Sequence, residues 1–224
     1  MLEHAEPATA PSWLDGALTQ FAADNADLTA RTRALLDSLI AEPKRHARML
    51  NTLSLLEHMG SHKIMATQHS AAIDQATLKH VAEEAHHAFF MKRQAEKTAE
   101  RALEYVAADL LAPSSARMYF QRLEGATVRA LGATRSARAA YLHMSMIVEF
   151  RALWFYGLYE EALKRARHAL SLKRVLGEEQ AHLGDMAERL EAGGELDDER
   201  AAQVLAAERR LYERLLGAIE RATT

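Results

Sequence analysis

Two short stretches with the same spacing decide how this sequence is interpreted: Glu84-Ala85-His86-His87 and Glu179-Gln180-Ala181-His182. Each contains Glu-x-x-His. At a spacing of three, the Glu and His side chains lie on one face of a helix. They are then close enough to bind the same metal ion or two adjacent ions. The two motifs therefore predict a metal site between two helices.

The composition around these motifs favours helix along the whole chain. Only four prolines and ten glycines occur among 224 residues, and Ala, Leu, Glu and Arg, which lose little on entering a helix, are plentiful. With 49% hydrophobic and 26% charged residues, the chain resembles a globular protein rather than a disordered one. We expect an all-α protein, with a flexible tail at 1–11, a single domain at 12–224 and a metal-binding core at about 43–192.

The apolar periodicity and the capping residues divide the domain into helices. Ser12 or Asp15 is expected to cap the first one, and Pro113 marks a break. Further helices are expected over residues 24–41, 43–68, 74–111, 115–131, 136–164 and 169–191, and from 197 or 198 nearly to the C-terminus.

Several classes of protein are disfavoured. The chain has no cysteine, which excludes disulfides, iron–sulfur clusters and thiolate nucleophiles. A net charge of −3 gives no general attraction to nucleic acid. No apolar run approaches the length of a membrane span, and residues 1–12 lack the apolar region of a signal peptide. We therefore expect a cytoplasmic protein without a membrane or nucleic-acid partner.

Two further carboxylates lie in apolar surroundings. Glu57 continues the stripe that contains Leu53 and Ile64, and Glu149 lies between Val148 and Phe150. A carboxylate buried without a partner is costly, so such positions usually face a charge. Four Glu side chains carry −4, which two divalent ions would balance.

The spacing of the four carboxylates agrees with this interpretation. In an antiparallel hairpin, residues at the same height are equidistant from the turn. The midpoint of Glu57 and Glu84 falls in a polar break, and the midpoint of Glu149 and Glu179 falls on Lys164 in a polar run. Each carboxylate would lie about 20 Å from its turn at about 1.5 Å per residue. All four can therefore share one layer.

This arrangement resembles the ferritin-like di-iron carboxylate superfamily, which includes ferritins, rubrerythrins, ribonucleotide reductase small subunits and di-iron oxygenases. The resemblance covers about residues 50–190. It implies a four-helix bundle, here with additional N- and C-terminal helices, and two ions, iron or a mixture of iron and manganese. The implied ligands are Glu57, Glu84, His87, Glu149, Glu179 and His182.

The superfamily also implies how the ligands divide. Glu57 and His87 would bind one ion, and His182 with Glu149 or Glu179 the other. Glu84 and one further carboxylate would bridge the two ions.

Other Glu residues near the two motifs are weaker ligand candidates because of the helical faces on which they lie. Glu83-x-x-His86 is an alternative frame, but Glu84 lies on the apolar stripe, whereas Glu83 shares its face with Lys79. Glu178 is expected on the solvent side. Glu160 shares a face with Glu149 but would lie nearer the turn.

Three other side chains are candidates for supporting roles. His80 lies one turn before Glu84 and is within reach of the site. Tyr156 lies two turns beyond Glu149 and is placed to hydrogen-bond a ligand or to pack in the core. Asp185 is placed either to orient an imidazole or to form a surface ion pair.

A carboxylate-rich site with one His per ion suits iron(II) or manganese(II). We expect a di-iron oxidase or oxygenase that uses O₂ and a small organic substrate, with an electron-donor protein and a homodimer as possible partners. A ferroxidase or iron-handling protein is the first alternative. A metal-free helical interaction module is the second.

Overall fold

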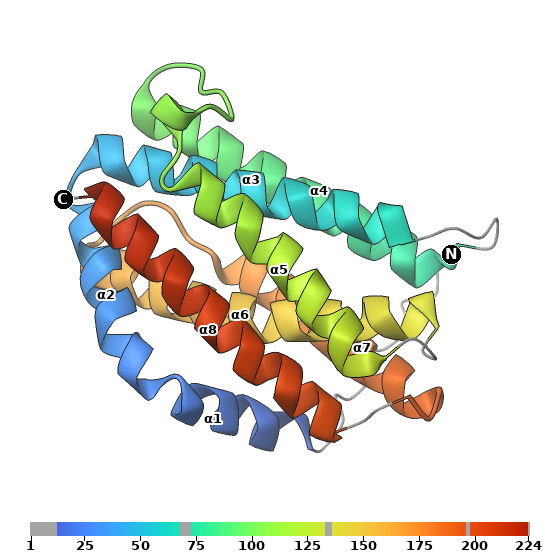
Figure 1. Cartoon of the computed structure of the whole chain (residues 1–224). Helices are drawn as coiled ribbons and strands as arrows, with labels where there is room; N and C mark the ends of the chain where they lie inside the picture. The colour runs from blue at the N-terminus through green and yellow to red at the C-terminus, as the bar shows by residue number, and fades with distance from the viewer. Residues whose placement is uncertain (1–12, 68–72, 133–135, 196–197, 224) are drawn as a thin grey trace.

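The computed structural model describes residues 13–67, 73–132, 136–195 and 198–223, and within them the chain is an all-helical bundle without strands (Figure 1). The expected all-α class is confirmed. The expected tail at 1–11 and the expected cap Ser12 lie outside the described residues. The helices are α1 (Leu14–Asp24), α2 (Ala26–Ile40), α3 (Pro43–Thr67), α4 (Gln75–Ala99), the short 3₁₀ helix η1 (Ala107–Asp109), α5 (Pro113–Leu131), α6 (Ala137–Arg165), α7 (Lys173–Ala192) and α8 (Asp198–Thr223).

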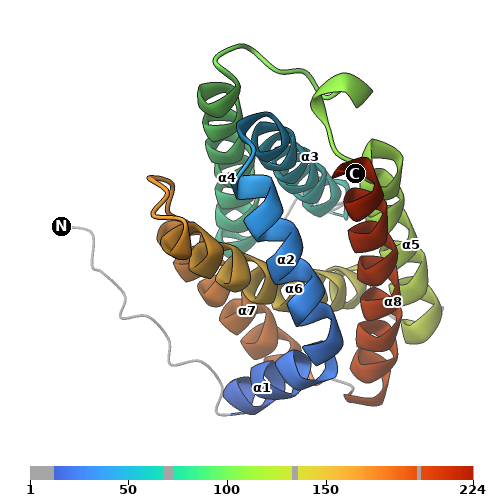
Figure 2. The same cartoon turned by 90° about the vertical axis from the view of Figure 1, so that its left-hand side faces the viewer.

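Two helical hairpins form the centre of the bundle. Helices α3 and α4 pack along each other over most of their length, and so do α6 and α7. Figure 2 shows the α3–α4 pair lying across the α6–α7 pair, with α4 approaching α7. The two sequence motifs therefore lie on facing helices of different hairpins.

The remaining long helices cover the two hairpins. Helix α8 packs along α5, and α2 packs on α6 and α3 (Figure 2). Their apolar faces belong to one large buried cluster that includes Leu36, Phe120, Phe155 and Leu216. Among the described residues, no helix is long and apolar enough to cross a membrane.

The starts of α4, α5 and α6 follow ordinary capping chemistry. Asp74 accepts a hydrogen bond from the backbone N–H of Thr77 at 2.7 Å and caps α4, and Ser136 does the same for α6 through Ala139 at 3.0 Å. Pro113 occupies the first turn of α5, where its missing N–H costs nothing.

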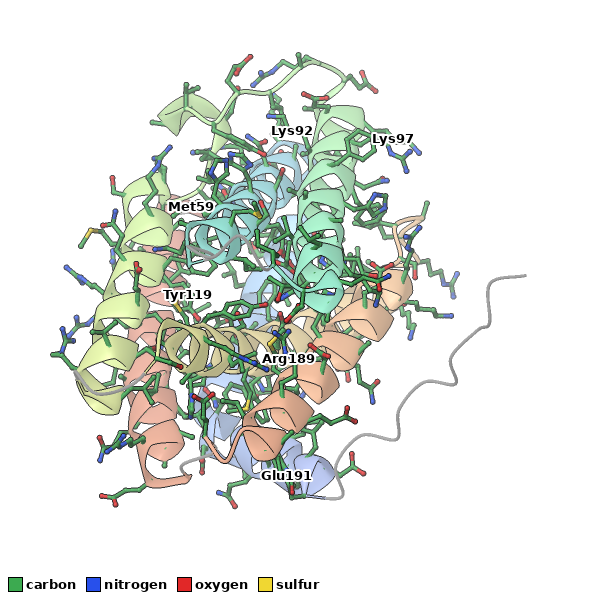
Figure 3. The ribbon with its side chains drawn as sticks, turned by 90° about the vertical axis from the view of Figure 1, so that its right-hand side faces the viewer. Met59, Lys92, Lys97, Tyr119, Arg189 and Glu191 are labelled. Atoms are coloured by element: carbon green, nitrogen blue, oxygen red, sulfur yellow. The ribbon has the colours of Figure 1, made fainter. Side chains whose placement is uncertain are left out.

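Helix α4 ends earlier than the sequence predicts. The expected helix to residue 111 is wrong, because the chain leaves α4 at Ala99 through Glu100, whose φ is +55°. Lys92 lies on α4 near this end (Figure 3). Its ammonium donates to the carbonyl of Leu103 and, at 3.0 Å, to Asn51. These tertiary contacts stabilise a loop at 100–112 that local helix propensity does not favour.

Helix α7 starts later than expected. The chain reverses over residues 166–172, so the predicted helix start at 169 is wrong by four residues. Glu160 accepts hydrogen bonds from the backbone N–H of Leu172 at 2.7 Å and from Ser171 at 3.3 Å. The weaker ligand candidate Glu160 thus anchors the turn.

Candidate metal centre

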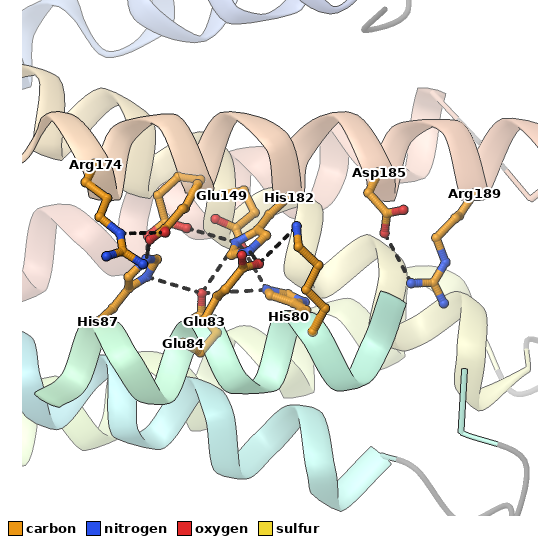
Figure 4. Close-up of polar contacts among 12 residues, drawn as sticks. His80, Glu83, Glu84, His87, Glu149, Arg174, His182, Asp185 and Arg189 are labelled. Atoms are coloured by element: carbon orange, nitrogen blue, oxygen red, sulfur yellow. Dashed lines mark hydrogen bonds and ion pairs between the residues drawn. The ribbon is translucent and has the colours of Figure 1, made fainter. Parts of the chain in front are cut away.

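Seven buried or half-buried side chains from four helices converge where α4 faces α7. Figure 4 labels five of them, His80, Glu84 and His87 on α4, Glu149 on α6 and His182 on α7; Glu57 on α3 and Glu179 on α7 complete the set. All are buried except Glu57, which as a whole residue is half-buried. They are the six side chains expected from the sequence together with His80.

The seven side chains form two groups of four. One group is Glu57, Glu84, His87 and Glu179, and within it one oxygen or nitrogen from each side chain lies within 4.8 Å of the others. The Nδ1 atom of His87 lies 3.3 Å from Glu179 and 3.7 Å from Glu84.

The second group contains His80, Glu84, Glu149 and His182, with the same spread of 4.8 Å. The Nε2 atom of His80 lies 3.2 Å from Glu149 and 3.6 Å from Glu84, and its Nδ1 hydrogen-bonds the hydroxyl of Tyr141 at 3.0 Å. His80 therefore faces the centre directly, closer than the supporting position expected from the sequence.

Two carboxylates connect the groups. Glu84 belongs to both. Glu179 places Oε1 3.3 Å from Nδ1 of His87 and Oε2 3.2 Å from Nδ1 of His182. Glu179 thus offers one oxygen to each group, whereas Glu84 offers the same atom, Oε1, to His87 of the first group and to His80 and His182 of the second.

The outer nitrogens of two imidazoles are held by carboxylates from the opposite hairpin. Nε2 of His87 donates to Glu178 at 2.8 Å, and Nε2 of His182 donates to Glu83 at 2.9 Å. In the neutral imidazole, these hydrogen bonds favour the tautomer with the proton on Nε2, so that Nδ1, which faces the centre, can act as a ligand atom.

Each outer carboxylate is itself paired with a basic residue one turn earlier. Arg174 lies 2.8 Å from Glu178, and Lys79 lies 3.3 Å from Glu83 (Figure 4). Asp185 takes no part, because its carboxylate pairs with Arg189 at 3.2 Å. The hydroxyl of Tyr156, in contrast, donates to Glu57, in agreement with the hydrogen bond expected for it.

The carboxylates differ in their proton affinity. Burial, with the charges of Glu84 and Glu179, raises the pKa of Glu57 well above its usual value, and burial with the same neighbours raises that of Glu149. Burial also acts on Glu84 and Glu179, but the nearby imidazoles outweigh it and lower both pKa values. For His87, burial is outweighed by Glu179 and Glu84, and the pKa rises to about 12.

The residues fit a pair of metal ions. Oε1 of Glu84 and Nδ1 of His87 are buried and have no hydrogen-bond partner, although they lie only 3.7 Å apart. A buried polar atom without a partner costs about 1–3 kcal/mol. A cation between these two atoms would satisfy both once His87 has released its proton, and four Glu side chains would balance two divalent ions.

A cavity of about 100 Å³ opens beside the centre. All four carboxylates, Glu57, Glu84, Glu149 and Glu179, contribute to one part of its lining, and the remaining lining is almost entirely apolar. On the opposite side, Gly60 on α3 faces Glu84, and a Cβ atom at Gly60 would lie 3.2 Å from Oε2 of that carboxylate.

Comparisons with known proteins identify no relative. A scan against protein-family models, a search of curated proteins and a search of solved structures each found no match to this chain.

Sequence reasoning missed Glu83 and Glu178, which it placed facing solvent. The sequence does contain a signal for them. In both Lys79–His87 and Arg174–His182, a basic residue is followed by three residues, two consecutive Glu residues, two further residues and His. The repeated double Glu marks an inner and an outer carboxylate on each helix.

Proposed function

We propose that the protein is a di-metal oxidase or oxygenase of the ferritin-like type, with iron in both positions. The observation that carries the proposal is the pair of overlapping ligand groups that share Glu84, together with the unpartnered Glu84 Oε1 and His87 Nδ1. Four helices supply one carboxylate each and α4 and α7 add the histidines, which is the recipe of ferritin-like di-iron proteins. Manganese in one position is compatible with the same ligands.

In this proposal the chain's own residues have distinct tasks. Glu57 and His87 would hold one ion, and Glu149, His182 and His80 would hold the other. Glu84 and Glu179 would be shared between the two ions. Bound iron(II) would supply electrons for the reduction of O₂. Tyr156 holds the carboxylate of Glu57, and the outer carboxylates hold His87 and His182.

The apolar cavity favours an oxidase with an organic substrate over an iron-storing ferroxidase. An iron-handling site needs a polar route for ions, whereas a cavity bounded by the carboxylates and by apolar side chains suits a small molecule.

Anaerobic iron(II) titration followed by exposure to O₂ tests the proposal. We expect about two irons per chain, by the ligand count, and an absorption change on exposure to O₂ that requires both irons. The double variant Glu84→Ala/His87→Ala should lose iron binding, while His86→Ala, at an exposed neighbouring position, should keep it. A wild-type protein that binds no iron would support the metal-free module instead, and a double variant that binds iron normally would show that Glu84 and His87 are not its ligands.

A further inference from the structure

Helices outside the ligand-bearing four contribute to the lining of the cavity next to the candidate metal centre. The four carboxylates occupy one part of the lining. Leu35 of α2, Phe120 of α5 and Leu216 of α8 line it elsewhere, and so do Tyr212 of α8 and Arg151 of α6. The cavity is therefore enclosed jointly by the ligand-bearing helices, mainly α3 and α6, and by α2, α5 and α8.

Arg151 is the only positively charged residue that lines this cavity, and its charge is already neutralised. It is 5% exposed, and its Nε and Nη2 atoms each donate to Glu208, which is fully buried, at 2.8 Å. Nη2 also donates to Asn25 at 2.8 Å, and Tyr119 donates to Glu208 at 2.8 Å. A buried ion pair is tolerated when its remaining polar atoms are satisfied.

One hydrogen-bond donor of this network has no acceptor. Nη1 of Arg151 is buried and has no hydrogen-bond partner among the described residues. The guanidinium is held in place by the ring of Tyr212 at 4.0 Å and by those of Phe21 and Trp154 at 4.7 Å. The donor is thus rigidly placed on a residue that lines the cavity, and nothing in the described chain satisfies it.

We propose that the cavity binds a compact, uncharged organic molecule that has an apolar body and one hydrogen-bond acceptor, such as a carbonyl or hydroxyl oxygen, for Nη1 of Arg151. This inference rests on the proposed function, since the molecule would be the substrate of the metal centre. A carboxylate ligand is disfavoured, because Glu208 already neutralises Arg151 and a second anion would be buried without a counter-charge.

The volume limits the size of the occupant. At about 100 Å³, the cavity is smaller than engineered apolar cavities of roughly 150 Å³ that bind benzene or xenon. It suits about five non-hydrogen atoms, or the end of a longer molecule of the same chemistry. Butanone and propanoate each have that size, and they differ in charge.

Binding to the metal-free full-length chain tests the inference without any activity. Xenon, observed by ¹²⁹Xe NMR, reports on the apolar cavity, and butanone and propanoate report on the donor. We expect xenon and butanone to bind and propanoate to bind at least about tenfold more weakly than butanone, because an unpaired buried charge costs more than one hydrogen bond contributes.

Variants locate the binding. Ala152→Phe and the milder Ala152→Leu fill space at a residue that lines the cavity and should abolish or weaken binding of both xenon and butanone. The matched control is Ala17→Phe, at a similarly half-buried position on α1 that does not line the cavity, and it should bind normally. Arg151→Lys should weaken butanone about fivefold and leave xenon binding unchanged.

The outcomes separate this inference from the proposed function. The inference is overturned if wild-type protein binds neither probe, if Ala152→Phe binds both normally, or if propanoate binds as tightly as butanone. If the probes bind as expected but iron does not, the cavity assignment stands and the metal proposal fails. If iron binds and the probes do not, the metal proposal stands and the cavity assignment fails.

Discussion

His87 on α4 donates a hydrogen bond from Nε2 to Glu178 on α7 over 2.8 Å. Glu178, in the α6–α7 hairpin, therefore orients an imidazole that belongs to the α3–α4 hairpin. The inner nitrogen of the ring, Nδ1, is left without a hydrogen-bond partner and faces Glu179 and Glu84.

Replacing the outer carboxylate should weaken metal binding without removing a ligand. We expect Glu178→Gln to lower the affinity for iron(II) or cobalt(II) by about 10- to 100-fold, the range found when partners of metal-bound histidines are removed. Anaerobic metal titration measures the effect. Asp185→Asn, on the same helix but paired with Arg189, is the control and should bind metal as the wild type does. Equal affinities for the two variants would contradict the role of Glu178.

Gly60 should be needed for the position of Glu84 rather than for the helix. The Cβ atom of Gly60→Ala would lie 3.2 Å from Oε2 of Glu84 and should displace that carboxylate, so metal affinity should fall. Alanine in a helix interior is favoured over glycine by about 1 kcal/mol, so the metal-free variant should unfold at an equal or higher temperature.

The control for this substitution is Gly157→Ala in α6, where nothing lies within 4 Å of the added methyl group. It should raise the melting temperature and leave metal affinity unchanged. If Gly60→Ala binds metal as tightly as Gly157→Ala does, the close approach to Glu84 is unimportant.

Metal binding should release protons. Without metal, burial and like charges raise the pKa values of Glu57 and Glu149, and contacts with Glu179 and Glu84 outweigh burial to raise that of His87 to about 12. All three must lose a proton to act as ligands, so we expect about three protons or more released per pair of ions near pH 7. The dependence of the calorimetric binding enthalpy on buffer ionisation measures the number. A value near zero would contradict the assigned ligands.

His46 should make the fold less stable in mild acid. Burial, with a smaller effect of His168, lowers its pKa from 6.5 to about 4, and its ring lies 2.5 Å from the hydroxyl of Tyr159. Its contribution to stability is fully present above pH 6.5 and is lost as the pH falls towards 4, because only the unfolded chain binds the proton in that range. At about 1.4 kcal/mol per pH unit the loss is at most about 3.5 kcal/mol.

Urea unfolding at pH 7.5 and pH 5 measures this effect as a difference between variants. His46→Gln should lose less stability between the two pH values than the wild type does, whereas the exposed His86→Gln should behave like the wild type. If His46→Gln and wild type lose stability equally, the buried ring is not the source.

The inner carboxylates could be predicted from the sequence because the apolar residues that surround them are neighbours on the same helix. Apolar neighbours along one helix select Glu84 over Glu83 and single out Glu57 and Glu149, and the structure brings these side chains together. The outer carboxylates could not be found this way. Lys79 and Glu83 form an ordinary i, i+4 pair on their own helix, and only the packing of α4 against α7 brings Glu83 to His182.

The end of α4 shows the same limit for the fold. Residues 100–111 include good helix formers, so local propensity extends the helix. The loop there depends on Lys92 of α4 and Asn51 of α3, and on an ion pair between Arg101 and Asp109 at 2.5 Å. Contacts of this kind are set by the assembled bundle and leave no periodic pattern in the chain.

The crossed hydrogen bonds to Glu83 and Glu178 make the two hairpins interdependent. Each hairpin carries imidazoles that the other one orients, so neither can present a finished set of metal donors alone. A chain cut within the loop at 100–112 would leave two half-sites of low affinity. The ions would then hold the two fragments together, and the metal concentration would control their reassembly.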